Sequence, residues 1–109
     1  MVAKMKEAKD EGRDIVILTA RSAHYRKETK EWLAKNDIPY DALYMRHAGD
    51  ERKDKKVKKE LLKQEVLPHF DIKKAYDDKK KNVRMFRKEG IDAERVNWWL
   101  RQTNLSLLN

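Results

Sequence analysis

Apolar residues along the first third of the chain alternate between helical and strand spacing. A helical block at positions 2, 5 and 8 ends at Gly12, as is typical of a helix C-terminus. Residues 14 to 19 then form an almost continuous apolar run, the pattern of a strand buried on both faces. Ser22 is a candidate N-cap for the next helix, whose inward positions are Tyr25, Thr29, Trp32 and Leu33. The stretch NDIPYD breaks that helix.

The rest of the chain repeats this alternation. The segment ALYMR (42–46) predicts a second strand, and the polar stretch HAGDERKD predicts a loop. A helix follows until Pro68, with one apolar face formed by Val57, Leu61, Leu62 and Val66. The segment DIKKAY (71–76) predicts a third strand, residues 79–89 a further helix ending at Gly90, and AERVNWW (93–99) a short fourth strand. We expect a C-terminal tail over about 98–109.

The order of these elements predicts the fold class. Strands that alternate with helices of about ten or more residues indicate a parallel sheet, because each parallel crossover needs a helix to return the chain. We therefore predict an α/β fold of three layers, a Rossmannoid parallel sheet with helices on both faces. The 109 residues contain no linker rich in Pro, Gly or Ser, so we expect residues 1–109 to form a single domain.

Polar residues follow each predicted strand. In open α/β sheets ligands bind beyond the carboxyl ends of the strands, which makes these residues candidates for a site. They are Thr19 and Arg21 after the first strand, Arg46 and His47 after the second, and Asp77 and Asp78 after the third. Hydroxyl and guanidinium donors beside two carboxylates suit a phosphate bridged to a hard cation such as Mg²⁺. The two aspartates also have a plainer explanation, as caps of the helix that follows.

Composition limits the classes of function. The absence of cysteine excludes a disulfide framework and a thiolate metal site. No apolar stretch reaches the roughly 18 residues of a membrane span, so we expect a cytoplasmic protein with no membrane partner. Lysine and arginine number 27 against 19 acidic residues, a net charge of +8. That excess fits nucleic acid as a partner, with Arg46 and Arg52 as candidate substrate-binding contacts, and it also fits lysines that only solvate helix faces.

Three segments resemble a known enzyme family. IVILTARS, IPYDALYMRHAGDERKDKKVKKELL and KKAYDDKKKNVRMFRKEGI are together similar to the phosphatase domain of phage-type polynucleotide kinase-phosphatases, members of the haloacid dehalogenase (HAD) superfamily. The similarity is collinear and covers roughly residues 5 to 92. It implies a HAD-like fold and hydrolysis of 3'-phosphate ends of nucleic acid with Mg²⁺ as the cofactor.

The resemblance also implies catalytic and metal-binding roles. Thr19 takes the phosphate-binding hydroxyl of the second family motif, and Arg21 assists it. Lys58, in the sequence VKKE, takes the lysine of the third motif. Asp77 and Asp78 form the metal-binding fourth motif. Such a set of cationic groups around a transferring phosphoryl group stabilises the charge of the transition state.

The family's nucleophile does not occur in these 109 residues. The superfamily uses an Asp-x-Asp-x-Thr motif on an earlier strand to form an aspartyl phosphate, and the sequence contains no Asp-x-Asp. By the resemblance this missing first strand is central, between the strands at 14–19 and 72–76. We therefore expect the isolated chain to bind Mg²⁺ weakly and to be inactive. We also expect the two flanking strands to pair directly, to accept a strand from another segment or chain, or to exchange elements in a homo-oligomer.

Three functions are compatible with these observations. The first is a 3'-phosphatase domain whose nucleophile is supplied from elsewhere. The second is a pseudoenzyme that binds phosphate or nucleic acid without chemistry. The third is an oligomerising assembly protein, in which an incomplete sheet and the Trp98-Trp99 pair drive association, although those tryptophans also fit base stacking or core packing. No GxxxxGK[ST] loop occurs, so we expect no kinase activity from these residues.

Overall fold

The computed structural model describes residues 2–96 and 105–109 of the chain. The strands are β1 (Val16–Ser22), β2 (Ala42–Arg46), β3 (Lys74–Asp77), β4 (Asp92–Arg95) and β5 (Leu105–Leu108). The helices are α1 (Val2–Asp10), α2 (Arg26–Lys35), α3 (Asp54–Leu61) and α4 (Lys80–Lys88). A short 3₁₀ turn at Ala23–Tyr25 leads into α2, and α3 continues into a π-helical turn at Leu62–Val66. Within the described ranges, no helix is long and apolar enough to cross a membrane.

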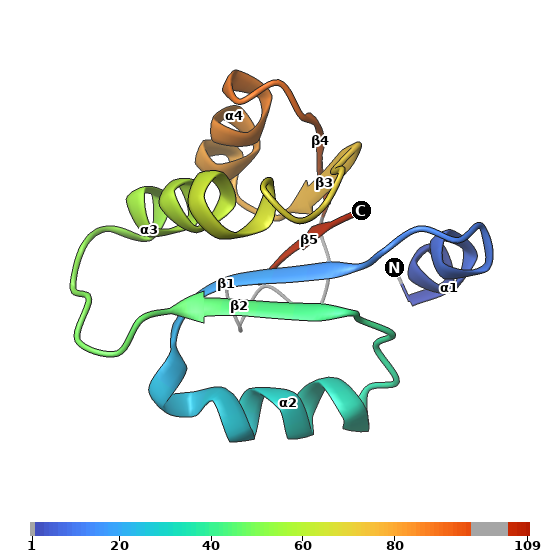
Figure 1. The fold of residues 1–109 in the computed structure, drawn as a ribbon, viewed down its shortest axis with the longest axis horizontal. Helices are drawn as coiled ribbons and strands as arrows, with labels where there is room; N and C mark the ends of the chain where they lie inside the picture. The colour runs from blue at the N-terminus through green and yellow to red at the C-terminus, as the bar shows by residue number, and fades with distance from the viewer. Residues whose placement is uncertain (1, 97–104) are drawn as a thin grey trace.

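The five strands form one sheet in the order β2-β1-β5-β3-β4, with α3 and α4 over one face and α2 over the other (Figure 1). The neighbours β1 and β2 are parallel, as are β3 and β4. The predicted α/β class with helices on both faces is therefore confirmed. The strand predicted over 93–99 is observed as Asp92–Arg95, and the Trp98-Trp99 pair lies outside the described residues.

The centre of the sheet holds β5, which the sequence analysis had assigned to a C-terminal tail. This strand is antiparallel to both of its neighbours, so the sheet is mixed rather than wholly parallel. It pairs Leu105 with Thr19 of β1, and Leu108 with Ala75 of β3. All four residues of β5 are buried. The chain thus fills the gap between β1 and β3 with a segment of its own, and the buried backbone groups of both edges find partners.

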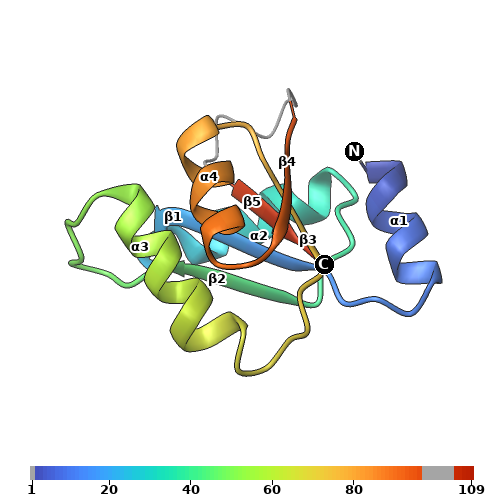
Figure 2. The ribbon, with the colours of Figure 1, turned by 90° about the horizontal axis from the view of Figure 1, so that it is seen from above.

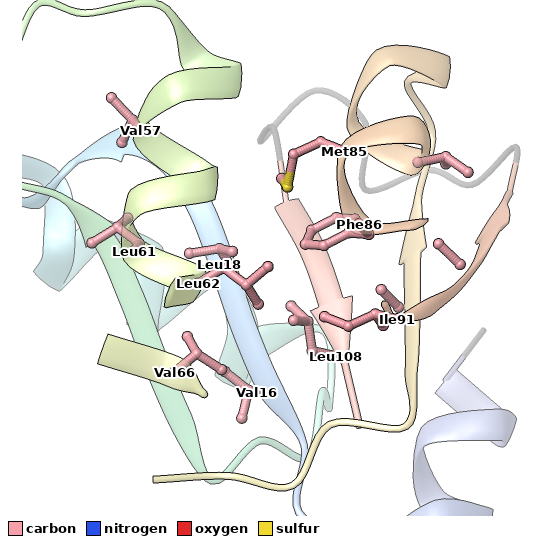
Figure 3. Close-up of a cluster of buried hydrophobic side chains, with 13 residues drawn as sticks. Val16, Leu18, Val57, Leu61, Leu62, Val66, Met85, Phe86, Ile91 and Leu108 are labelled. Atoms are coloured by element: carbon pink, nitrogen blue, oxygen red, sulfur yellow. The ribbon is translucent and has the colours of Figure 1, made fainter. Parts of the chain in front are cut away.

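Two apolar clusters cover the two faces of the sheet. On one face Val16, Leu18 and Leu108 pack against Leu62 of the π-helical turn and Phe86 of α4 (Figure 3). On the other face, residues from β1, β2 and β5 pack against α1 and α2; they include Met5, Ile17, Leu33, Leu43, Leu105 and Leu107. Because strand side chains alternate between faces, β1 and β5 contribute to both clusters. The sheet is therefore the middle layer of three, and it fixes the positions of the residues at its strand ends.

Candidate active site

A buried polar cluster joins α3, β3 and β5 through Lys58, Asp77 and Ser106. Lys58 Nζ donates to Asp77 Oδ2 at 3.2 Å and to Ser106 Oγ at 2.9 Å. The Ser106 hydroxyl donates to the same carboxylate oxygen, Asp77 Oδ2. All three side chains are fully buried. Because a buried charge is costly without a partner, the ammonium and carboxylate groups of this cluster depend on each other.

Asp77 also organises the turn that follows β3. Its Oδ1 accepts the backbone N–H of Lys79 at 2.9 Å, and its Oδ2 accepts Asn82 Nδ2 at 3.2 Å. The plainer explanation for this aspartate, that it caps the next helix, is thus partly seen in the structure. The same carboxylate nevertheless faces Lys58, so one residue both fixes the strand-to-helix turn and holds a buried cation.

Burial shifts the protonation equilibrium of Lys58. Removal of the ammonium group from water lowers the pKa of Lys58 below its ordinary value, and the Asp77 carboxylate opposes that shift. The proton on Lys58 is therefore tied to the presence of a negative charge beside it.

Thr19 is the middle residue of β1, and Arg21 is the last but one. The regular pairing of β1 with β2 ends at Thr19, because the register shifts between Thr19 and Ser22. Thr19 is fully buried, and its Oγ1 accepts the backbone N–H of Arg21 at 3.0 Å. The Arg21 guanidinium lies over the ring of Tyr25, 5.1 Å from its centroid. Thr19 thus ends the regular pairing of β1 with β2, Asp77 ends β3, and β5 lies between β1 and β3.

Arg46 is held by the protein itself. Its Nε donates to the carbonyl oxygen of Ala20 at 2.6 Å, and its Nη1 donates to that of Asp50 at 3.0 Å and that of Arg52 at 2.5 Å. Its Nη2 forms a 2.6 Å ion pair with Asp54 Oδ1 at the start of α3. This guanidinium ties β1 to the loop after β2 and to α3, a positioning role that its place in the sequence does not reveal. A substrate contact by Arg46 stays a prediction.

Arg52 lies between two carboxylates. Its Nη2 is 2.6 Å from Asp50 Oδ2, and its Nη1 pairs with a Glu60 carboxylate oxygen. The guanidinium holds the pKa of Asp50 well below its usual range and lowers that of Glu60. The charge of Arg52 is therefore balanced locally, and its contact with nucleic acid also stays a prediction.

Two buried oxygens beside the cluster have no hydrogen-bond partner, Asp78 Oδ1 and Asn82 Oδ1. Carboxylate and amide oxygens are ligands suited to a hard cation, and Mg²⁺ usually keeps several waters beside one or two protein ligands. The residues present therefore fit an oxygen-bound cation, although no cluster of three or more His, Cys, Asp or Glu is found among the described residues. Asp77 Oδ2 accepts hydrogen bonds from Lys58, Asn82 and Ser106, whereas Oδ1 accepts the Lys79 amide, so Oδ1 is the oxygen of Asp77 better placed to take a metal on its second lone pair.

Sequence reasoning missed two members of the site. Ser106 is the one polar residue in the buried strand LSLL, and Asn82 lies in the first turn of the helix after the Asp77-Asp78 pair. A polar residue in an otherwise apolar strand was the available signal for Ser106. It was not used, because that segment was assigned to a tail.

Comparisons with known proteins identify the family. Residues 1–98 match the family model described as polynucleotide kinase PNKP phosphatase domain. Chains from solved structures of the Pnkp1/Rnl/Hen1 RNA repair complex and of the Pnkp1/Rnl/Hen1 complex are each 36% identical, with a TM-score of 0.83 over 89% of this chain. The chain spans about a third of their length, 32% and 34%. As the resemblance of its segments predicted, the chain belongs to the family of polynucleotide kinase PNKP phosphatase domains.

Proposed function

We propose that this chain is the phosphatase part of a nucleic-acid repair system and removes 3'-phosphate ends with Mg²⁺. The observation that carries the proposal is the buried pair between Lys58 of α3 and Asp77 at the end of β3, in a PNKP phosphatase domain. The similar solved chains belong to an RNA repair complex, which supports nucleic-acid ends as the substrate and other repair proteins as partners.

Each residue of the site has a physical role in this proposal. The Thr19 hydroxyl donates to a phosphoryl oxygen, with Arg21 assisting, and the Lys58 ammonium offsets the negative charge that spreads over the oxygens in the transition state. Asp77 and Asp78 would hold Mg²⁺, with Asn82 Oδ1 as a further oxygen, and the bound ion would neutralise phosphoryl charge. The two orphan oxygens support this assignment of the metal site.

We propose that the nucleophile arrives on a strand that replaces β5. The residues matching the family end at 98, and β5 begins at Leu105, outside the match. In the structure as described, Ser106 hydrogen-bonds with both Lys58 and Asp77, so β5 keeps the cluster closed. Three buried leucines of β5 stabilise that state by about 1.5–3 kcal/mol each. An incoming strand must therefore be comparably apolar and must end in an aspartate that reaches the phosphoryl group.

Adding the missing strand to the chain tests the proposal directly. The unaided chain should release little phosphate from a 3'-phosphorylated oligonucleotide. A segment with an apolar strand ending in Asp-x-Asp-x-Thr, fused before Met1 or added in trans, should produce Mg²⁺-dependent release. An Asn-x-Asn version of the same segment is the matched control and should not. Lys58→Ala or Asp77→Ala should abolish the restored activity. Robust turnover by the unaided chain that survives both substitutions would refute the assignment of the site.

Binding without hydrolysis is the second candidate function. The closed cluster favours it, because Ser106 occupies the hydrogen bonds that a phosphate would need from Lys58. Nucleic-acid binding that persists while the supplied strand gives no turnover would select this function over the first. The assembly hypothesis loses one of its two grounds, since β5 pairs with the edges of both β1 and β3 that were expected to be open. Its other ground, the Trp98-Trp99 pair, lies outside the described residues.

A further inference from the structure

A basic hollow of about 330 Å³ lies between α4 and β4, which run side by side (Figure 2). We call it the α4/β4 basic pocket. Its lining is formed by Lys80, Val83, Arg84, Arg87 and Arg95. Four of these five residues are cationic and none is acidic. All four cationic residues are exposed to solvent. The pocket therefore concentrates positive charge in one concave place on the surface.

Backbone carbonyl groups hold two of the arginines in place. Arg87 donates from Nε and Nη2 to the carbonyl oxygen of Ala93, at 3.1 and 2.9 Å. Arg95 Nε donates to the carbonyl oxygen of Asp78 at 3.0 Å. A neutral carbonyl oxygen orients a guanidinium without cancelling its charge. In the part of the chain that the structure describes, no ion pair joins any of the four pocket cations to a carboxylate.

The basic surface of α3 differs in this respect. There Arg52 pairs with Glu60, while Lys59 and Lys63 approach Glu89 at 3.9 and 3.7 Å. Carboxylates thus balance much of the positive charge near Arg52, one of the two arginines that the sequence analysis gave as candidate substrate-binding contacts. The α4/β4 basic pocket keeps its charge available for a ligand, and this difference follows from side-chain pairing that composition does not show.

We propose that the α4/β4 basic pocket binds the backbone phosphates of single-stranded nucleic acid. Arginine and lysine bind phosphate oxygens directly, and such contacts depend little on base sequence. Arg95 links the pocket to Asp78, so a strand held here passes beside the end of β3 and its candidate metal ligands. The inference rests on the proposed function in taking nucleic acid as the ligand, but it requires no hydrolysis.

Salt-dependent binding tests the pocket. Affinity for a fluorescent single-stranded oligonucleotide is measured by anisotropy over a range of salt concentrations, with EDTA present so that no Mg²⁺-dependent reaction occurs. The test variant is Lys80→Gln with Arg84→Gln, because both side chains are exposed and neither makes a hydrogen bond within the described residues. The control is Lys27→Gln with Lys30→Gln, an equal charge change on exposed residues of α2, across the sheet.

The outcomes separate the pocket from the overall charge. Each phosphate contact on a single strand contributes about 0.7 to the slope of log K against log salt, so loss of two contacts makes the slope shallower by about 1.4. We expect this change for the pocket variant, the wild-type slope for the α2 control, and retention of the slope in Lys80→Arg with Arg84→Lys. Equal effects of the pocket variant and the α2 control, or no binding by the wild-type chain, would overturn the inference. A shallower slope in the pocket variant, in a chain that hydrolyses no 3'-phosphate even when the Asp-x-Asp-x-Thr segment is supplied, would refute the proposed function and leave the pocket standing.

Discussion

Replacing Lys58 by methionine measures how strongly the buried cluster depends on its cation. Methionine has a similar length and no charge, so it removes the hydrogen bonds to Asp77 and Ser106 while largely filling the space. Removing one partner of a buried ion pair costs about 3–5 kcal/mol, because the other charge stays buried. Asp77 keeps donors from Ser106, Asn82 and the Lys79 amide. We therefore expect the free energy of unfolding to fall by about 3 kcal/mol, near the lower end of that range.

A loss of this size leaves the chain folded but is easily measured. Domains of this length have unfolding free energies of roughly 5–15 kcal/mol, and about 3 kcal/mol corresponds to a fall in Tm of roughly 12–24 °C. The double variant Lys58→Met with Asp77→Asn removes both charges together. Its loss should be smaller than the sum of the two single losses by at least about 1 kcal/mol, because neither charge is left alone.

Urea denaturation followed by circular dichroism gives these free energies. Lys59→Met is the matched control, since Lys59 is the next residue on α3, is exposed, and forms only a surface contact with Glu89 at 3.9 Å. We expect this control to lie within about 0.5 kcal/mol of the wild type. A Lys58→Met variant equally close to the wild type, or strictly additive losses in the double variant, would refute a paired buried cluster.

Three other predictions concern pH, metal and core. Burial lowers the pKa of Lys58 in the folded state, so the unfolded state binds more protons. The free energy of unfolding should therefore rise with pH between the lowered pKa of Lys58 and its ordinary value of 10.5. Urea denaturation should show a flatter rise in Lys58→Met; identical pH profiles would contradict the shift. Calorimetry should show weak Mg²⁺ binding that Asp78→Asn abolishes, and unchanged binding would remove Asp78 from the metal site. Phe86→Ala should cost about 3–5 kcal/mol in urea denaturation, since Phe86 is fully buried, and a loss under about 1 kcal/mol would contradict its core position.

Local patterns were enough to predict most of the fold. The second strand was predicted over residues 42–46 and is observed there as β2, because its apolar run and flanking turn residues are adjacent in the sequence. The central strand β5 could not be predicted in this way. It has four residues, and its place depends on pairing with β1 and β3, which lie far away along the chain. Such long-range pairing leaves no periodic signal in a short segment.

The site was predicted unevenly for a similar reason. Asp77 was expected because it follows a strand, whereas Lys58 was identified only through family resemblance. Among many lysines of α3, Lys58 stands out only in lying one helical turn before Leu61 and Leu62, and thus on the buried face. Arg46 donates hydrogen bonds to backbone carbonyl oxygens of the loop that follows it, and no pattern of residues in the sequence specifies where those carbonyl groups lie.

Hydrogen exchange at β5 tests the central claim, that the chain closes its own sheet with Leu105–Leu108. The amides of Leu105–Leu108 should be protected to a degree close to that of β1, because a central strand exchanges only through extensive unfolding. The measurement uses the unaided 109-residue chain, with residue-resolved exchange followed by NMR. Protection of Leu105–Leu108 comparable to that of Val16–Thr19 is the result we predict. Fast, unprotected exchange at Leu105–Leu108 beside a protected β1 would contradict the claim.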